Sequence, residues 1–463
     1  MQNNKHKIAL LFPDGVGIKN YLYTNVFKQD KADLVLLHNF DPETVAEIKK
    51  QTPLGGDFEI PVYKESVAEK FLRELICLAR LQFNAKKVAN PSLLCNWKTS
   101  HKGIFHQLFY AFIGFIAPLF SIRYSNILFL ENLYQKRIRK NVFYRKSLSL
   151  LKEINPSILF CSHQRGLKAA TVFAAATDLG IKTTTVIYSW DNLPKARLAL
   201  RADTYLVWSD HMKEEIKLFY PEILQTSVVV TGTPQFECYA NGHNIIDKTI
   251  FYKQYNLSID KKIICFSGDD VKTSPDDPKY LNDIVSALID ANLQDQYQIL
   301  FRRCPVDVSN RFDKVLNKYS DLIKVAPPLW FFNKSEHWTT IYPSKDDVKL
   351  LVSTAFYSDI VVNVGSTMAF DFAMFDKSCV FINYDQKTKN DPNWSVETIY
   401  KYQHFKSMPN KESVIWLNGS EEIITKLTKQ FSDTSAMNRW KEVVLGNYQN
   451  ASEQIQIQLT KDL

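Results

Sequence analysis

The sequence contains little glycine and no cysteine pattern that would bind a metal. Glycine accounts for 14 of 463 residues, which excludes long glycine-rich linkers. The seven cysteines show none of the short spacings that hold zinc. Several lie inside apolar runs, such as Cys161 in ILFC and Cys265 in IICF. An odd number of thiols in apolar runs is typical of a reducing compartment.

The sequence also lacks a long apolar run at its start and a large excess of one charge. The apolar part of MQNNKHKIALLFPDG is too short for the core of a signal peptide. The formal net charge is +8 at pH 7, and no stacking module accompanies the basic residues, so we expect no nucleic-acid partner. These features predict a cytoplasmic protein.

What the sequence does contain is a repeated alternation of short β-branched runs and helical stretches. The pattern begins at residue 8, is interrupted by a mostly helical segment at about 64–151, and restarts after Gly232-Thr233-Pro234. Such alternation predicts an α/β fold with two Rossmann-like, doubly wound parallel-sheet domains facing across a cleft. The predicted parts are an N-terminal domain at 1–234, a C-terminal domain at 235–435, and a helix at 436–463 that packs back on the first domain.

One stretch in the second half, 358–385, joins a strand, a Gly-Ser-Thr turn, a helix and a second strand. Gly365 permits a tight turn, and Ser366 and Thr367 are good N-cap residues. A helix N-terminus with free N–H groups favours an anion such as a phosphate. Asp371 interrupts the apolar helix, and a buried carboxylate needs a partner. We predict that Asp371 binds a ribose diol; the alternative is an ordinary turn with a solvated Asp.

Ligands of open parallel sheets bind beyond the carboxyl ends of the strands. In the second half, this rule selects Ser267, Gly268, Asp269, Arg302 and Arg303. Together with the turn at 365–367, these residues suit a nucleoside diphosphate, because an arginine can neutralise the β-phosphate and make the diphosphate a better leaving group. No paired Asp-x-Asp motif follows an N-terminal strand, so no metal is expected. The alternative for the two arginines is a solvated strand end.

In the first half, the same rule selects Asp14, His163 and Asp191. An inverting glycosyl transfer needs one general base beside the acceptor hydroxyl. Asp14 lies in a glycine-flanked loop that ligands can approach, and His163 precedes a helix, where a neutral imidazole is favoured. We rank the candidates for the base as Asp14, then His163, then Asp191. Each residue taken alone also suits a cap or a turn.

The segment 104–122, IFHQLFYAFIGFIAPLFSI, is apolar and aromatic. Basic residues flank it, at Lys98, Lys102, Arg123, Lys136, Arg137, Arg139, Lys140, Arg145 and Lys146. An aromatic stripe with basic edges suits a helix that lies on an anionic membrane surface, at the inner face of the cell membrane. The alternatives are a buried helical hairpin and a membrane span, which the proline and the polar residues disfavour.

Four segments resemble a bacterial GT-B glycosyltransferase family of surface-polysaccharide synthesis. They are SWDNLPKARLALRADTYLVWSDHMKEEI at 189–216, VVVTGTPQFE at 228–237, FRRCP at 301–305 and VNVGSTMAFDFAMFDKSCVFI at 362–382. The FRRCP segment resembles the family's Arg-Pro-His-Pro motif, and the last segment resembles its donor site. Cys304 stands where the family has His, and Asp371 where many relatives have Glu.

The resemblance implies a glycosyltransferase. We expect it to need no metal and no other cofactor and to invert the anomeric centre, while retention stays open as the alternative. Its partners would be a nucleotide-sugar donor and a surface-glycan acceptor, free or lipid-linked. Two alternatives stay open: a nucleotide-sugar epimerase on the same fold, and a catalytically inactive, membrane-associated scaffold. The departure at Cys304 favours the scaffold.

Overall fold

The computed structural model of the chain describes residues 6–28, 32–99, 103–240, 242–332, 341–428 and 433–461. Lys102, one of the basic residues named above, lies outside these ranges. The chain divides into two compact units. Unit 1 combines Met1–Gln235 with Val444–Leu463, and unit 2 is Phe236–Val443. The first unit is therefore built from two segments of the chain.

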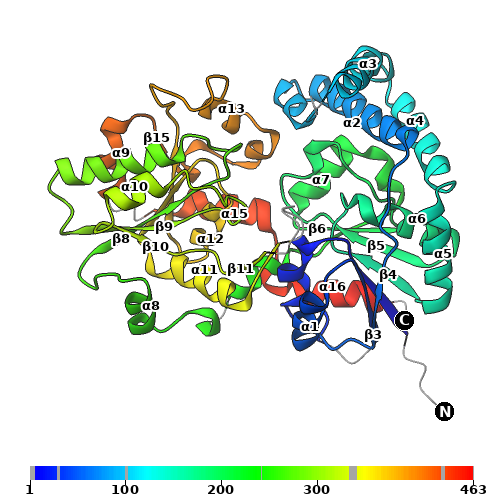
Figure 1. Cartoon of the computed structure of the whole chain (residues 1–463), viewed down its shortest axis with the longest axis horizontal. Helices are drawn as coiled ribbons and strands as arrows, with labels where there is room; N and C mark the ends of the chain where they lie inside the picture. The colour runs from blue at the N-terminus through cyan, green and yellow to red at the C-terminus, as the bar shows by residue number, and fades with distance from the viewer. Residues whose placement is uncertain are drawn as a thin grey trace. The chain divides into compact units, whose positions relative to one another are not determined.

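Unit 1 contains a seven-stranded sheet in which every neighbouring pair of strands is parallel (Figure 1). Its strands are β1 (Lys7–Phe12), β2 (Asp33–His38), β3 (Gly56–Glu59), β4 (Ile158–Cys161), β5 (Lys182–Val186), β6 (Thr204–Val207) and β7 (Ser227–Val230). The order is β3-β2-β1-β4-β5-β6-β7. The central strands are buried along nearly their whole length, as expected for a parallel sheet covered on both faces. The order in which strands are added to the sheet reverses between β1 and β4, and ligands of such sheets bind at this switch point.

The helices of unit 1 include a helical insertion between β3 and β4. They are α1 (Pro42–Gln51), α2 (Val67–Lys87), α3 (Ile104–Phe120), α4 (Tyr124–Ile138), α5 (Val142–Ile154), α6 (Ala170–Asp178), α7 (Asp210–Phe219) and α16 (Ala451–Thr460). Figure 1 shows α2, α3 and α4 gathered together, and these three helices pack against one another. A capping box between Ser66 and Glu69 begins α2.

Unit 2 contains a six-stranded parallel sheet of order β10-β9-β8-β13-β14-β15. A separate two-stranded antiparallel sheet accompanies it. The strands are β8 (Lys262–Ser267), β9 (Tyr297–Arg302), β10 (Ile323–Val325), β11 (Trp330–Phe331), β12 (Tyr342–Pro343), β13 (Ile360–Asn363), β14 (Ser378–Ile382) and β15 (Ile415–Leu417). Here the switch in strand order falls between β8 and β13. The prediction of two doubly wound parallel sheets is therefore confirmed.

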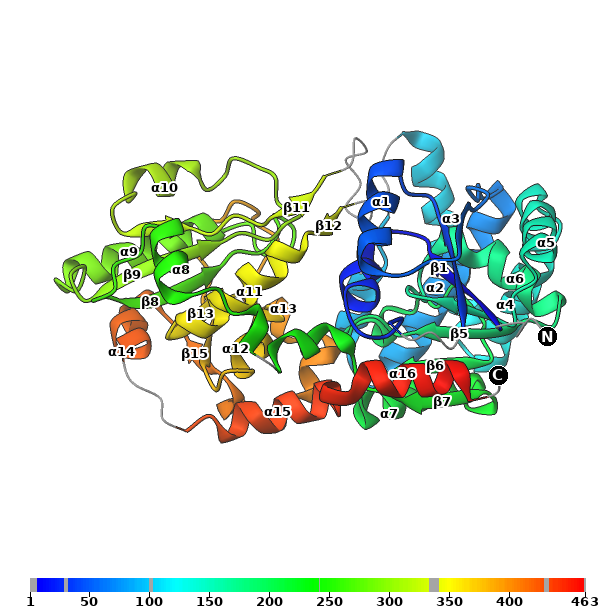
Figure 2. The same cartoon turned by 90° about the horizontal axis from the view of Figure 1, so that it is seen from below.

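The helices of unit 2 are mostly short. They are α8 (Lys248–Gln254), α9 (Asp277–Asp290), α10 (Asp313–Lys318), α11 (Lys345–Tyr357), α12 (Met368–Ala373), α13 (Val396–Tyr400) and α14 (Ile423–Thr428). The next helix, α15 (Ser435–Leu445), spans the boundary between the units and is followed by α16 in unit 1 (Figure 2).

Candidate functional site

A hydrogen-bonded Asp–His pair lies at the switch point of the unit 1 sheet. Asp14 follows β1 and His163 follows β4, and these two strands are neighbours. The Nδ1 atom of His163 lies 2.6 Å from Oδ2 of Asp14. Because a carboxylate accepts, this contact places the proton on Nδ1 and leaves Nε2 as the basic nitrogen. The structure thus brings together the first two sequence-predicted candidates for the base.

Close packing of the two loops holds this pair in place. The other carboxylate oxygen of Asp14 accepts a 3.2 Å hydrogen bond from the backbone N–H of Val16. A side chain at Gly17 would lie 2.4 Å from Cβ of Ser162, so only glycine lets the loops approach this closely. The imidazole of His163 meets the ring of Tyr188 edge to face, with the centroids 4.4 Å apart. Both partners of the pair are buried, at 7% exposed for Asp14 and 5% for His163, which strengthens the hydrogen bond between them.

Asp191, the third candidate, is engaged in a turn of its own. Its carboxylate accepts hydrogen bonds from Ser189 Oγ at 2.8 Å and Asn192 Nδ2 at 2.9 Å, and it forms an ion pair with Lys195. The neighbouring Asn192 links this turn to the β4 loop, because its Oδ1 accepts 3.2 Å hydrogen bonds from Gln164 and Arg165. These contacts give Asp191 the role of a turn residue that orders the loop beside His163.

A buried carboxyl group lies in α7 behind this turn. Glu215 is 5% exposed, and its Oε2 has no hydrogen-bond partner among the described residues. Burial, with a smaller contribution from the Asp191 carboxylate, raises the pKa of Glu215 from 4.5 to about 8. Nε2 of His211 lies 3.8 Å from Oε1 of Glu215, and burial lowers the pKa of His211, which favours the neutral imidazole.

We expect Glu215→Gln to stabilise the protein at alkaline pH. The unfolded chain loses the Glu215 proton near pH 4.5 and the folded chain near pH 8, so stability falls as pH rises through this window. The variant removes that loss, which is about 1.4 kcal/mol for each pH unit of the window, and we expect a gain of about 4–5 kcal/mol in the free energy of unfolding at pH 8.5 and almost none at pH 4.5. Urea titrations at both pH values measure the difference. Glu214→Gln is the matched control, because Glu214 is exposed and pairs with Lys217; equal pH dependence in both variants would contradict the prediction.

In unit 2, the arginine at the end of β9 is committed to a protein carboxylate. Arg302 is 5% exposed, and its NH2 atom lies 2.9 Å from both carboxylate oxygens of Asp347 in α11. Arg303 is half-buried, and its guanidinium donates to the backbone carbonyl of Ser309 at 3.0 Å. Both arginines therefore have partners inside unit 2, a feature that their position after an apolar strand did not indicate.

The Gly-Ser-Thr turn after β13 is tightly packed. Gly365 has φ +69°, and a side chain there would lie 2.8 Å from Phe405, so this position requires glycine. The backbone N–H of Ser366 donates to Asn363 at 2.8 Å, and Thr367 is the N-cap of α12. Asp371 in α12 is buried and accepts a 2.6 Å hydrogen bond from the hydroxyl of Tyr239. Tyr239 thus occupies one oxygen of the carboxylate that the sequence assigned to a ribose.

Carboxylates crowd the loop after β8. Ser267 and Gly268 are buried, and the N–H of Gly268 donates to the carbonyl of Arg302 at 2.9 Å, which joins the β8 and β9 strand ends. Burial raises the pKa of Asp269 well above its ordinary value, and the carboxylates of Asp277 and Asp270 add to this. The effect favours a protonated Asp269, which would not repel a phosphate.

Sequence reasoning missed a residue that organises this loop, Arg311. Its Nε donates to Asp307 at 2.6 Å and its NH1 to the carbonyl of Ser274 at 2.7 Å, and its NH2 donates to the carbonyl of Asp269. Arg311 lies in a loop well beyond the end of β9, and no spacing pattern in the sequence links it to Asp269. The described residues include no group of three or more His, Cys, Asp or Glu side chains able to hold a metal ion.

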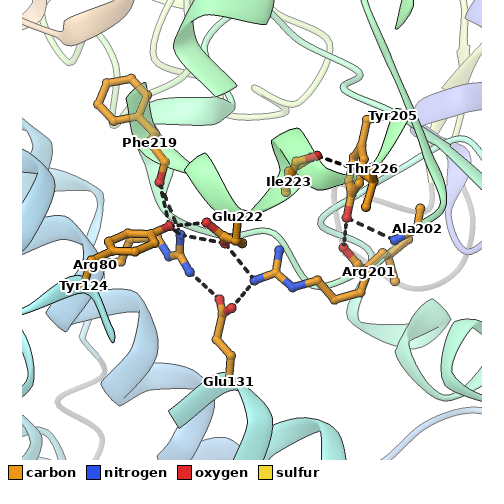
Figure 3. A network of polar contacts seen from close by, with 11 residues as sticks. Arg80, Tyr124, Glu131, Arg201, Ala202, Tyr205, Phe219, Glu222, Ile223 and Thr226 are labelled. Atoms are coloured by element: carbon orange, nitrogen blue, oxygen red, sulfur yellow. Dashed lines mark hydrogen bonds and ion pairs between the residues drawn. The ribbon is translucent and has the colours of Figure 1, made fainter. Parts of the chain in front are cut away.

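A second polar cluster lies in unit 1, beneath the helical insertion (Figure 3). Arg80 of α2 is 1% exposed, and it pairs with Glu131 of α4 and with Glu222 at 3.2 Å. Figure 3 shows Glu131 between the guanidinium groups of Arg80 and Arg201, bound to both. Burial by itself raises the pKa of Glu131, but Arg201 and Arg80 lower it overall. The network fastens the insertion to the loop before β6, which carries Arg201, and to the segment after α7, which carries Glu222.

No family model and no curated protein sequence matches this chain. Solved structures do. UDP-GlcNAc 2-epimerase from Neisseria meningitidis, bound to UDP-GlcNAc, is similar with a TM-score of 0.54 at 11% identity, covering 98% of this chain and 100% of that one. The S. aureus MnaA–UDP co-structure has a TM-score of 0.50 at 12% identity, over 99% and 96% of the two chains. Arabidopsis thaliana UGT89C1 complexed with UDP-L-rhamnose has 0.50 at 7% identity, over 99% of both.

These similarities and the two doubly wound sheets define the class to which the structure belongs. The chain has the GT-B fold, as predicted. Identities of 7–12% establish the architecture and nothing finer. The chemistry must therefore be argued from the residues of this chain.

Proposed function

We propose that this chain is a glycosyltransferase that moves a sugar from a nucleotide-sugar donor, with a UDP-sugar first among candidates, to a lipid-linked glycan acceptor. The observation that carries the proposal is the 2.6 Å Asp14–His163 contact at the switch point of the unit 1 sheet. Such a pair provides a base of fixed orientation in a buried loop. Support for the donor class comes from the GT-B neighbours, whose structures hold UDP, UDP-GlcNAc or UDP-L-rhamnose.

In the proposed reaction, Nε2 of His163 accepts the proton of the acceptor hydroxyl as that oxygen attacks the anomeric carbon. The bond between this carbon and the donor phosphate breaks, and the nucleoside diphosphate leaves with the bonding electrons. The carboxylate of Asp14 stabilises the imidazolium that forms, so Asp14 is a positioning residue and not the base that the sequence ranked first. A single displacement of this kind inverts the anomeric centre. We place the diphosphate at the Ser267–Asp269 and Gly365–Thr367 loops, which flank the switch point of unit 2, and we propose that no metal is needed.

A second candidate function is a UDP-sugar 2-epimerase. The observation that favours it is the similarity to the N. meningitidis epimerase over nearly the whole chain. An epimerase uses the same nucleotide site but no acceptor. The two functions therefore differ in whether the reaction requires an acceptor.

The test is a product assay with a panel of nucleotide sugars, with and without a glycolipid extract. A transferase releases the nucleotide rapidly only when acceptor is present, and EDTA does not slow it. An epimerase converts its UDP-sugar with no acceptor. If calorimetry detects no binding of any nucleotide, both enzymatic functions are wrong and the scaffold alternative stands.

A lipid-linked acceptor is proposed because α3 carries an exposed apolar face. One side of the helix is core, with Tyr110, Ile113 and Ala117 buried. The opposite side exposes apolar side chains at helical spacing, namely Phe105 (89%), Leu108 (62%), Phe112 (55%), Phe115 (79%) and Leu119 (61%). None of the helices within the described ranges has both the length and the apolarity to span a bilayer. A helix with one face in the core and an apolar face outward suits the interface of a bilayer.

We expect salt-sensitive binding to anionic vesicles, mediated by this face and by basic residues of the insertion. Lys136, Arg137 and Lys140 are exposed, whereas Arg139 pairs with Asp178 at 2.8 Å. Replacing the three exposed residues by Gln should weaken binding about 100-fold, since each cation near an anionic surface contributes about 1 kcal/mol. Phe105→Ser with Phe115→Ser should abolish it.

Vesicle co-sedimentation at low and high salt measures this binding. The matched control replaces three exposed lysines of unit 2, Lys248, Lys272 and Lys314, by Gln. If wild-type protein does not bind anionic vesicles at low salt, or if the control variant loses binding equally, α3 does not contact the membrane.

A further inference from the structure

Arginine side chains converge on one cavity in unit 1. The cavity has a volume of about 90 Å³ and is bounded by α2, α4, the β4 loop and the segment 196–201. Five arginines line it: Arg73, Arg80, Arg165, Arg197 and Arg201. Phosphate and carboxylate groups are the usual partners of such guanidinium clusters.

Four of the five arginines have carboxylate partners. Arg73 pairs with Glu65 at 2.7 Å and with Glu74 at 2.8 Å, and Glu74 also accepts from Arg197 at 3.3 Å. Arg80 and Arg201 share the remaining two carboxylates, those of Glu131 and Glu222. Four arginines thus balance four glutamates, and these residues contribute no net charge.

Arg165 is the fifth arginine. None of the ion pairs described above neutralises the positive charge of its guanidinium. It donates from NH1 to the neutral Oδ1 of Asn192 at 3.2 Å. Its Nε is buried and has no hydrogen-bond partner among the described residues, and the same holds for NH1 of Arg201. Asp191, the sequence neighbour of Asn192, pairs with Lys195. Buried guanidinium donors without acceptors are costly, so within the part of the chain that the structure describes the cavity lacks one anionic partner.

We propose that this cavity binds one phosphate group of the acceptor, held by Arg165 with Arg201. This proposal rests on the proposed function, because it supplies the acceptor subsite. Arg165 lies two residues after His163 in the β4 loop, and Gln164 between them donates to the same Asn192 oxygen at 3.2 Å. A phosphate bound by Arg165 is therefore anchored on the loop that carries the base. The walls of the cavity also include α2 and α4, which pack against α3, so a lipid phosphate and a soluble sugar phosphate both fit this chemistry.

The test measures binding to the full chain with the donor site saturated by UDP. The probes are inorganic phosphate, glucose 1-phosphate and vesicles containing phosphatidic acid. We expect Arg165→Gln to weaken phosphate binding roughly 10- to 100-fold, the effect of losing bonds to a charged group. The matched control is Arg145→Gln, which removes an exposed arginine of α5 and should leave affinity unchanged. If Arg165→Gln does not fold, Arg165→Lys keeps the charge without the Nε donor and should bind severalfold more weakly.

The outcomes separate the sources of phosphate. Loss confined to the vesicle arm assigns the site to a lipid phosphate, and loss in the glucose 1-phosphate arm assigns it to a soluble one. Equal affinity of wild type and both Arg165 variants for every probe, or no binding of any probe to wild type, overturns the proposal. UDP titration of each protein before any phosphate probe is added reports on the proposed function separately. A chain that binds phosphate through Arg165 but binds no nucleotide would refute the transferase and retain the anion site.

Discussion

His163→Gln is expected to lower turnover about 10²- to 10⁴-fold while leaving donor affinity unchanged. This is the usual contribution of a positioned general base. Glutamine keeps a polar side chain of similar reach but cannot accept and retain a proton at neutral pH. Asp14→Asn should also lower turnover, because an amide does not stabilise the imidazolium as a carboxylate does. It should also shift the pH profile of turnover, which a purely structural defect would not do.

The measurement is initial-rate release of the nucleotide from the donor identified in the binding panel, together with calorimetric donor affinity. Asp191→Asn is the control, because Asp191 lies in a neighbouring loop but already binds Ser189, Asn192 and Lys195. We expect its effect to be smaller than about tenfold. Full activity in His163→Gln, combined with a large loss in Asp191→Asn, would transfer the role of base to Asp191.

Arg80→Met is expected to destabilise unit 1 by about 3–5 kcal/mol. The substitution keeps most of the apolar volume but removes the positive charge that Glu131 and Glu222 share with Arg201. Without Arg80, two largely buried carboxylates share the single guanidinium of Arg201. One negative charge is then left uncompensated, which is far more costly than breaking an exposed pair. The hydroxyl of Tyr124 and the carbonyl of Phe219 also lose a donor (Figure 3).

Urea unfolding followed by circular dichroism measures this effect. Arg139→Met in the same helical insertion is the matched control. Arg139 and Asp178 are each about 30% exposed, at 29% and 31%, so the loss should not exceed about 1 kcal/mol. If the two variants are equally stable, the network beneath the insertion contributes orientation and no net stability.

The strand-end rule placed Asp14 and His163 correctly in loops, but it could not pair them. Their contact spans 149 residues and exists because β1 and β4 are neighbours, although two strands and the helical insertion separate them in sequence. The same limit applies to Arg302, whose partner Asp347 lies in the first turn of α11, 45 residues away. A local pattern identifies which residues follow a strand, whereas their partners depend on the order of strands in the sheet.

The helical insertion shows a different limit. Both faces of α3 are apolar, so periodicity could not distinguish the buried side at Ile113 from the exposed side at Phe115. The burial of Arg80 was also hidden from sequence patterns, but for a different reason. A charged residue in a helix usually faces solvent, and Arg80 is buried only because Glu131 and Glu222 reach it from distant segments.

The division of unit 1 into two chain segments has a consequence for biosynthesis. Its last helix, α16, buries Ala451, Ile455 and Leu459 along one stripe. The turn before it is fitted closely to the remainder of unit 1, because a side chain at Gly446 would lie 2.4 Å from the carbonyl oxygen of Trp208. Domains usually fold in the order in which the ribosome releases them. Here the whole of unit 2 is translated before α16, so the buried stripe of α16 can join unit 1 only after unit 2 has been made.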